Sequence, residues 1–130
     1  MPSVIVVDDD PYMRKLIKSV LQEAGHKVHV TSNGVECLDY LVEFEPNLII
    51  TDICMPHMDG IQAIKNILSI TRTIKIIAIT SDNQTFKDSY SDAALKLGVS
   101  SVLLKPFKIT DLLKAVNQAL NTVSDNNISK

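Results

Sequence analysis

The sequence predicts an α/β fold: a doubly wound, five-stranded parallel sheet with helices on both faces. Short aliphatic runs recur along the chain, and stretches with helical spacing of apolar residues separate them. Nearly continuous apolar runs are typical of strands buried on both faces, and their alternation with helices favours parallel pairing through right-handed crossovers. A chain of 130 residues is long enough to form one domain with its own core.

Four strong apolar runs and one weaker run predict the five strands. The strong runs are Val4–Val7, Leu48–Thr51, Ile76–Ile79 and Val102–Leu104. The weaker run, His26–Val30, alternates between polar and apolar residues and therefore suits the edge of the sheet.

Apolar residues spaced three or four apart predict a helix after each strand. The helical patterns cover Met13–Ala24, Val35–Val42, Ile61–Leu68, Phe86–Leu97 and Ile109–Leu120. Pro11 suits the first turn of the first helix, and Gly25 suits its C-terminal end. Asn33, with Glu36 three residues later, has the pattern of an N-cap for the second helix.

Composition excludes several classes of protein. Thirteen basic against 15 acidic residues give a net charge of −2, which argues against a nucleic-acid-binding surface. No apolar run approaches the ~18 residues of a membrane span, and the N-terminus becomes acidic too early for a signal peptide. Cys37 and Cys54 are therefore interpreted as reduced thiols of a cytoplasmic protein. We expect one domain over residues 1–122, a polar flexible tail over 123–130, and no output domain.

Polar residues follow four of the predicted strands. They are Asp8, Asp9 and Asp10 after the first strand, Asp52 after the third, Thr80 and Ser81 after the fourth, and Lys105 after the fifth. In open α/β sheets ligands bind at the carboxyl ends of the strands, where these side chains converge. Carboxylates suit Mg²⁺, and one of them can accept a phosphoryl group while a metal, a lysine and a hydroxyl neutralise its charge.

The repulsion within the run Asp8–Asp10 must be offset by a metal ion, by a helix N-terminus or by solvent. At ~5 Å and an effective dielectric constant of ~20, each pair of carboxylates costs roughly 3 kcal/mol. Asp10 directly precedes Pro11 at a helix start, so we interpret it as an N-cap rather than a metal ligand.

With these residues the sequence resembles the receiver domains of response regulators in bacterial two-component signalling. The resemblance rests on the pair Asp8–Asp9, the segment "DICMPHMDG" around Asp52, Thr80 followed by a small residue, and "KPF" beginning at Lys105. It covers essentially the whole chain. It implies the flavodoxin-like (βα)5 fold with strand order 2-1-3-4-5.

The resemblance also implies a role for each residue. Asp52 would be the phosphoacceptor, Lys105 and Thr80 would hold phosphoryl oxygens, and Ser81 would lie on the path to the phosphoryl group. Mg²⁺ would be bound by Asp8, Asp9, Asp52 and the backbone carbonyl of Cys54. The peptide bond between Lys105 and Pro106 would be cis, which costs little only before proline.

The implied function is a switch controlled by phosphorylation. A sensor histidine kinase or a phosphotransfer protein would donate the phosphoryl group to Asp52 in a Mg²⁺-dependent step. The phosphorylated state would alter protein contacts at the face of the fourth helix, fifth strand and fifth helix. The chain would catalyse only its own phosphorylation and dephosphorylation. We expect a downstream protein target, no nucleic acid, no membrane, and a monomer or a phosphorylation-dependent dimer.

Three features depart from the family pattern. Val102 stands where receivers often have an aromatic residue, so we expect any switch to run through Thr80 and the fourth helix, with Tyr90 as a candidate. Thr80 and Lys105 are 105 − 80 = 25 positions apart, about three more than expected, or nearly one helical turn. Cys54 and Asp82 occupy variable positions near the site.

Other functions remain open at this point. "VIVVDDDPY" also resembles the nucleophile motif of haloacid-dehalogenase-like phosphatases, with Asp8 as nucleophile and Asp10 as acid. Tyr12 and Pro11 depart from that motif, and no acidic pair follows the fourth strand. A receiver-like adapter that is never phosphorylated is another alternative, which absence of Mg²⁺ binding would support. Nucleotide binding is disfavoured because no glycine-rich loop follows the first strand.

Overall fold

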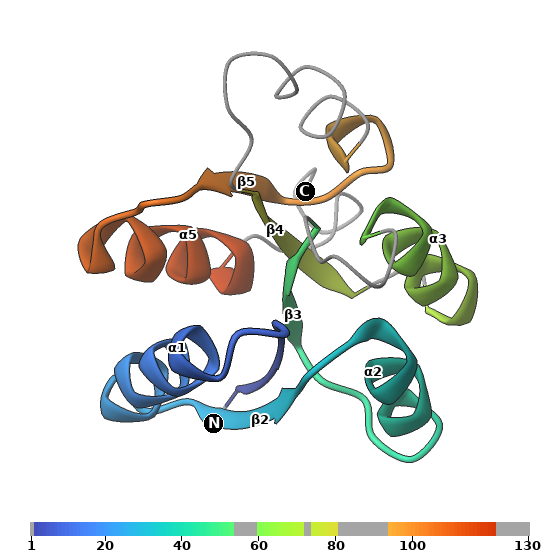
Figure 1. Cartoon of the computed structure of the whole chain (residues 1–130), viewed down its shortest axis with the longest axis horizontal. Helices are drawn as coiled ribbons and strands as arrows, with labels where there is room; N and C mark the ends of the chain where they lie inside the picture. Colours follow the sequence, from blue (N-terminus) through green and yellow to red (C-terminus); the bar gives the residue numbers. More distant parts are fainter. Residues whose placement is uncertain (1, 54–59, 72–73, 81–93, 122–130) are drawn as a thin grey trace, which may run out of the picture.

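The computed structural model describes residues 2–53, 60–71, 74–80 and 94–121, and contains one five-stranded parallel sheet in the order β2-β1-β3-β4-β5 (Figure 1). The strands are β1 (Ser3–Val7), β2 (Lys27–Thr31), β3 (Leu48–Asp52), β4 (Lys75–Thr80) and β5 (Ser101–Leu104). The predicted fold class and strand order are confirmed. The weaker run forms the edge strand β2, which begins one residue later than expected.

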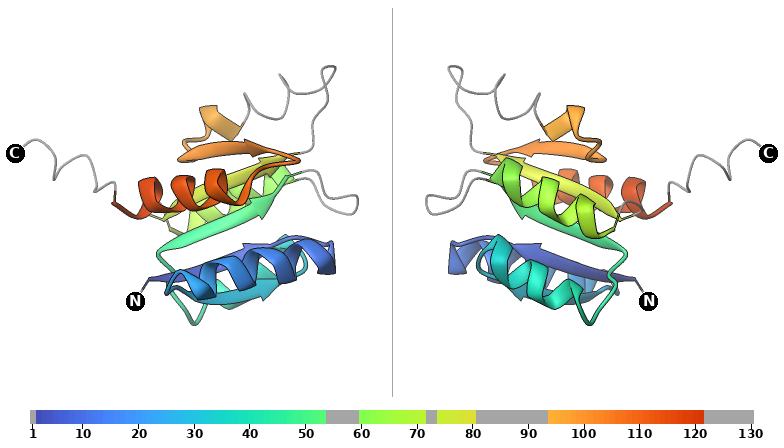
Figure 2. Two further views of the ribbon diagram at one scale, coloured as in Figure 1. Left: turned by 90° about the vertical axis from the view of Figure 1, so that its left-hand side faces the viewer. Right: turned by 90° about the vertical axis from the view of Figure 1, so that its right-hand side faces the viewer.

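Helices cover both faces of the sheet, as Figure 1 shows. They are α1 (Pro11–Glu23), α2 (Gly34–Leu41), α3 (Gly60–Ile70) and α5 (Ile109–Asn121). Helices α1 and α5 lie on one face and α2 and α3 on the other, each running along the strands (Figure 2). The predicted fourth helix falls mainly outside the described residues, although residues 94–96 are helical.

The alternation of side chains along β1 divides the core into two clusters. Val4 and Val6 pack with Ile17 and Leu21 of α1 and with residues of α5. Ile5 and Val7 pack on the other face in the cluster that includes residues of α2 and α3. All five residues of β3 are buried, which explains the continuous apolar pattern that predicted this strand.

Local capping starts the first two helices. The Asp10 side chain accepts a hydrogen bond of 3.0 Å from the Tyr12 amide, so the predicted N-cap of α1 is confirmed. Asn33 likewise caps α2 by accepting from the Glu36 amide at 2.9 Å. The Glu36 carboxylate does not return to Asn33 but accepts from the amide and hydroxyl of Ser32. Gly25 follows α1 with a φ of +97°, a conformation that favours glycine.

Within the described segments, no helix is both long and apolar enough to cross a bilayer. The expected tail over residues 123–130 lies outside those segments. Its flexibility and the expected absence of an output domain stay predictions.

Candidate functional site

Four strand ends bring polar side chains to one edge of the sheet. Asp8 directly follows β1, Asp52 is the last residue of β3, Thr80 is the last residue of β4, and Lys105 directly follows β5. Asp8, Asp52 and Thr80 are buried, and Lys105 is partly buried. This parallel sheet therefore gathers, at its carboxyl edge, groups that are far apart in the sequence.

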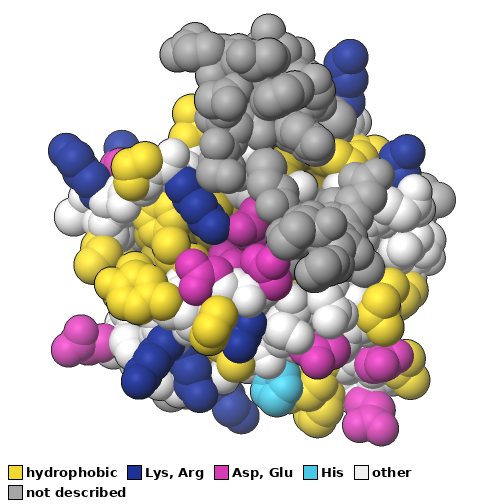
Figure 3. Space-filling view, in the orientation of Figure 1, with side chains coloured by type: hydrophobic (Ala, Val, Ile, Leu, Met, Phe, Trp, Pro, Cys, Tyr) yellow, Lys and Arg dark blue, Asp and Glu magenta, His cyan; other side chains and the backbone are white. Residues whose placement is uncertain are grey.

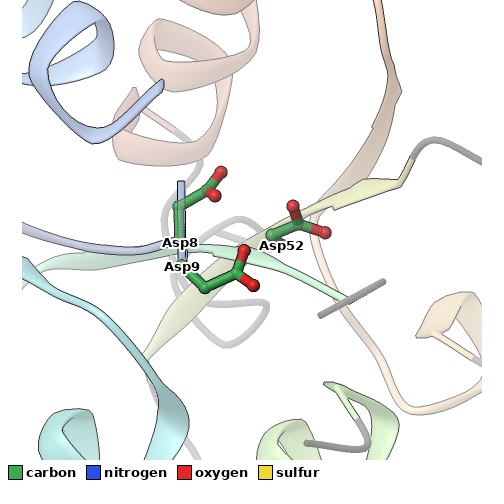
Figure 4. Close-up of side chains that lie close together, drawn as sticks. All are labelled: Asp8, Asp9 and Asp52. Atoms are coloured by element: carbon green, nitrogen blue, oxygen red, sulfur yellow. The ribbon is translucent and has the colours of Figure 1, made fainter. Parts of the chain in front are cut away.

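Three carboxylates form the acidic part of the site. Oxygen atoms of Asp8, Asp9 and Asp52 all lie within 4.8 Å of one another. Figure 4 shows Asp8 and Asp9 leaving the end of β1 on one side, with Asp52 facing them from β3. Acidic side chains gather at the centre of this face, with Lys and Arg side chains beside them (Figure 3). The arrangement matches the oxygen-rich sets that bind hard divalent cations.

Lys105 provides the positive charge next to these carboxylates. Its Nζ donates a hydrogen bond of 2.7 Å to Oδ2 of Asp52 and lies 3.6 Å from Oδ2 of Asp8. Burial by itself lowers the pKa of Lys105, but the hydrogen bond and charge of Asp52, with a contribution from Asp8, raise its pKa overall. The ammonium group therefore stays charged beside Asp52.

Asp8 is the most deeply buried of the three carboxylates. Burial raises its pKa, the hydrogen bond from the Asp10 amide to Oδ1 opposes this shift, and the charge of Asp52 adds to it. Its Oδ2 is buried and has no hydrogen-bond donor within the described residues. A buried carboxylate oxygen of this kind is a suitable ligand for a cation between Asp8, Asp9 and Asp52.

Backbone contacts hold the strand ends in place. The Lys105 amide donates to the carbonyl of Thr80 at 2.8 Å, so the lysine is tied to the end of β4. The Ile53 amide donates to the Ile79 carbonyl at the same distance, which ties the segment after Asp52 to β4. The Lys105–Pro106 peptide bond is cis, as the family resemblance implied.

Arg14 belongs to the site and was missed in the sequence analysis. Its Nη1 donates a hydrogen bond of 2.7 Å to the backbone carbonyl of Asp8. The contact fixes the peptide between Asp8 and Asp9, the two acids that leave the end of β1. The available signal was weak: Arg14 is a basic residue one helical turn after the N-cap Asp10.

The structure brings together five of the predicted site residues: Asp8, Asp9, Asp52, Thr80 and Lys105. The predicted residues Cys54 and Ser81 lie outside the described segments, as do Asp82 and Tyr90. Val102 is partly buried against the cluster beneath α2 and α3, so an aliphatic side chain fills this position.

The sequence matches the model of a protein family over most of its length. The model of the response regulator receiver domain matches residues 4–117. The chain belongs to this family. The match includes all of the sheet except Ser3, together with most of α5, so the receiver domain accounts for the described fold.

Relatives of this receiver domain include chemotaxis proteins. The chain is 34% identical to chemotaxis protein CheY of Bacillus subtilis over 119 residues, covering 91% of this chain and 97% of that protein. It is also 34% identical to CheY of Thermotoga maritima, covering 88% of this chain and 94% of the relative. The protein is therefore a receiver domain of the CheY and response-regulator type.

Solved structures agree with the sequence relatives. Chemotaxis response regulator CheY4 of Vibrio cholerae has a TM-score of 0.82 at 28% identity, covering 92% of this chain and 99% of that one. Response regulator TrrA of Thermotoga maritima, solved in complex with Mg²⁺-BeF, has a TM-score of 0.79 at 30% identity, covering 92% and 100%. These neighbours share the receiver fold along nearly the full chain.

Proposed function

We propose that this receiver domain is a phosphoacceptor switch in which Asp52 carries the phosphoryl group. The observation that carries the proposal is the hydrogen bond of 2.7 Å between Lys105 Nζ and Asp52 Oδ2, made beside two further carboxylates. A carboxylate paired with a lysine at the end of a buried strand is positioned to become an acyl phosphate. The same lysine then faces the new phosphoryl oxygens.

The side chains of Asp8, Asp9 and Asp52 fit a Mg²⁺ ion. Oδ2 of Asp8 is buried without a hydrogen-bond donor in the described part of the chain, and the three residues supply only hard oxygen ligands. Following the family resemblance, the carbonyl of Cys54 would complete the protein's share of the ligands. When bound, the ion supplies positive charge that offsets the oxygens of Asp52 and of the incoming phosphoryl group. The related TrrA, which was solved with Mg²⁺-BeF, supports this assignment.

The transfer step uses the chain's own groups. An Asp52 oxygen attacks phosphorus, the bond from phosphorus to the donor histidine nitrogen breaks, and the released electron pair stays on the imidazole. Lys105 approaches the transferred oxygens from β5, and Thr80 lies next to it at the end of β4. Catalysis by the protein is then mainly positioning and charge neutralisation, as is usual for phosphoryl transfer.

Phosphorylation replaces the single negative charge of the Asp52 carboxylate with the roughly two negative charges of an acyl phosphate, and Lys105 and Thr80 are the groups that we expect to respond. Because the Lys105 amide binds the Thr80 carbonyl, β4 and β5 would move together. We propose that the changed surface is the face of the fourth helix, β5 and α5, and that it binds a downstream protein. The proposed donor is a cytoplasmic histidine kinase or phosphotransfer protein. The chain would catalyse only its own phosphorylation and dephosphorylation.

The phosphatase alternative, with Asp8 as nucleophile and Asp10 as acid, is less well supported. Asp10 uses its carboxylate to cap α1 through the Tyr12 amide. Asp8 already accepts a hydrogen bond from the Asp10 amide, and Lys105 is closer to Asp52 than to Asp8. The nucleophile position therefore suits Asp52 better.

Incubation with Mg²⁺ and acetyl phosphate, followed by intact-mass measurement, tests the assignment. We expect one phosphoryl group on the wild type, none on Asp52→Asn, and none when Mg²⁺ is chelated. Asp39→Asn, a change to an exposed aspartate on α2, is the matched control and should be phosphorylated like the wild type. If peptide mapping placed the phosphoryl group on Asp8, the phosphatase alternative would replace the proposed function.

A further inference from the structure

Helix α2 exposes apolar side chains on its outer face. Val35 is 56% exposed and Val42, the C-cap of the helix, is 80% exposed. They are seven residues apart and therefore lie on the same side of the helix. Phe44, in the turn that follows, is 50% exposed. Valine does not favour a helix, and these two valines are exposed. Neither helix propensity nor packing within this domain therefore explains why they stand here.

Acidic residues surround these apolar side chains. Asp39, Glu43 and Glu45 are exposed, and the sequence contains no lysine or arginine between Lys27 and Lys65. Figure 3 shows acidic and hydrophobic side chains next to one another over α2, at the lower right. We define the α2 surface as Val35, Asp39, Val42, Glu43, Phe44 and Glu45.

Two hollows flank Phe44. One, of about 210 Å³, is lined by Val28, His29, Tyr40 and Phe44 among others. The other, of about 240 Å³, is lined by Val42, Phe44 and Ile70 among others. Both are below the ~300 Å³ at which small-molecule pockets begin, and they suit single side chains of a partner.

Stacked aromatic rings hold Phe44, which lies between the two hollows, in place. Phe44 stacks on Tyr40 with ring centroids 4.3 Å apart, and Tyr40 stacks on His29 at 3.6 Å. The Tyr40 hydroxyl also lies 2.8 Å from Nδ1 of His29. Because three rings support one another from α2 to the edge strand β2, the surface is ordered before any partner arrives.

We propose that the α2 surface docks a basic amphipathic helix of a partner protein. Apolar residues of that helix would enter the hollows beside Phe44 and cover Val35 and Val42. Its lysine or arginine residues would face Asp39, Glu43 and Glu45. An apolar centre beside Asp39, Glu43 and Glu45 matches helix-in-groove recognition, and these acidic residues favour a basic partner although Lys27 also lines the first hollow.

The part of the α2 surface around Phe44 lies away from the phosphorylation site, whereas Val35 lies at the start of α2, four residues after Thr31, whose carbonyl accepts from the Asp8 amide. The first hollow reaches Ser3 and Lys27, at the opposite ends of β1 and β2 from Asp8. A partner helix centred on Val42 and Phe44 therefore leaves Asp52 accessible. Binding is expected with or without a phosphoryl group, so the docking role can fail while the phosphoacceptor role stands.

Titration of the unphosphorylated full chain with a helical leucine–lysine peptide tests the proposal, with amide NMR shifts as the readout. We expect shifts concentrated in α2 and residues 42–45. The same peptide with glutamate in place of lysine should not bind. Glu43→Lys should weaken binding at least about fivefold, whereas Glu23→Lys, the same charge change on α1, should weaken it less than about twofold. Val42→Ser should weaken binding about tenfold, and Leu95→Ser should not.

Four results would overturn the proposal. They are no binding of the leucine–lysine peptide, shifts spread evenly over the domain, equal effects of Glu43→Lys and Glu23→Lys, or concentration-dependent shifts of the α2 amides without peptide. The last result would assign the surface to a second copy of this chain. Val42 is exposed, so its replacement leaves no cavity and the comparison does not depend on altered folding.

Discussion

Lys105 Nζ lies 2.7 Å from Asp52 Oδ2 although the residues are 53 positions apart in the sequence. The pair joins the ends of β3 and β5 across β4. The Lys105 ammonium group lies next to both Asp52 and Asp8. Within the described part of the chain, it is the one ammonium group that contacts these carboxylates. Lys105 thus offsets the repulsion between buried acids, in addition to any part it plays in phosphoryl transfer.

Removal of this ammonium group should destabilise the fold. We expect Lys105→Met to lower the free energy of unfolding by about 2 kcal/mol in EDTA, because Asp8 and Asp52 lose their cation. Added Mg²⁺ should reduce the difference in free energy of unfolding between Lys105→Met and the wild type. Urea denaturation of the wild type and of Lys105→Met measures this free energy. Lys108→Met, at an exposed position, is the control and is expected to change stability by less than about 0.5 kcal/mol.

Asp8 should make stability depend on pH in an unusual direction. Because burial raises its pKa, its stabilising contribution is complete below its ordinary value of 3.8 and is lost as the pH rises through the folded-state pKa. Asp8→Asn should therefore stabilise the metal-free protein at neutral pH, by on the order of 1 kcal/mol, and flatten this part of the profile. Thermal unfolding in EDTA across acidic to neutral pH measures both effects. A less stable variant at neutral pH would contradict the prediction.

Asp10 should affect stability and not phosphorylation. Asp10→Ala removes the hydrogen bond to the Tyr12 amide and should cost about 1 kcal/mol, whereas Asp10→Asn should retain most of the stability. Phosphorylation by acetyl phosphate should proceed at the wild-type rate in both variants. A large loss of Mg²⁺ affinity in Asp10→Asn would show that Asp10 is a ligand after all.

Arg14 should matter for metal affinity through the backbone. Arg14→Ala frees the Asp8 carbonyl and should weaken Mg²⁺ binding about fivefold, or about 1 kcal/mol, which is part of the roughly 1.5–3 kcal/mol of a hydrogen bond made by a charged group. Lys15→Ala, at the neighbouring exposed position, is the control. Titration calorimetry compares the two. Equal affinities would show that the peptide between Asp8 and Asp9 is held without Arg14.

Cys37 should be chemically silent in the folded protein. It is fully buried, and burial raises the pKa of its thiol to about 12. Since the thiolate is the reactive form, iodoacetamide should fail to label Cys37 at neutral pH in a Cys54→Ser background. Labelling should appear when urea unfolds the protein. Rapid labelling under native conditions would mean that α2 opens readily.

Much of the fold could be predicted because its signals are local. Apolar runs mark the strands, and an aspartate directly before Pro11 marks the start of α1. The candidate site followed from the rule that parallel strands deliver their carboxyl ends to one edge, so Asp8, Asp52 and Lys105 could be grouped before any distance was known.

Details set by long side chains could not be predicted. Arg14 has a long and flexible side chain, and its hydrogen bond to the Asp8 carbonyl depends on the folded geometry. Glu36 was expected to complete the cap at Asn33, but Ser32 offers its carboxylate both an amide and a hydroxyl. Competing partners of similar energy leave no trace in the sequence pattern.

The two-sided packing of β1 has a consequence for tolerance to insertion and deletion. Val4 and Val6 serve one core cluster and Ile5 and Val7 the other, and Asp8 follows in the same register. Exchanges among aliphatic residues in β1 preserve both clusters. Loss of a single residue reverses which side chains face each layer and turns Asp8 away from Lys105. In a library of variants, β1 should therefore accept many substitutions and almost no frame-preserving deletions.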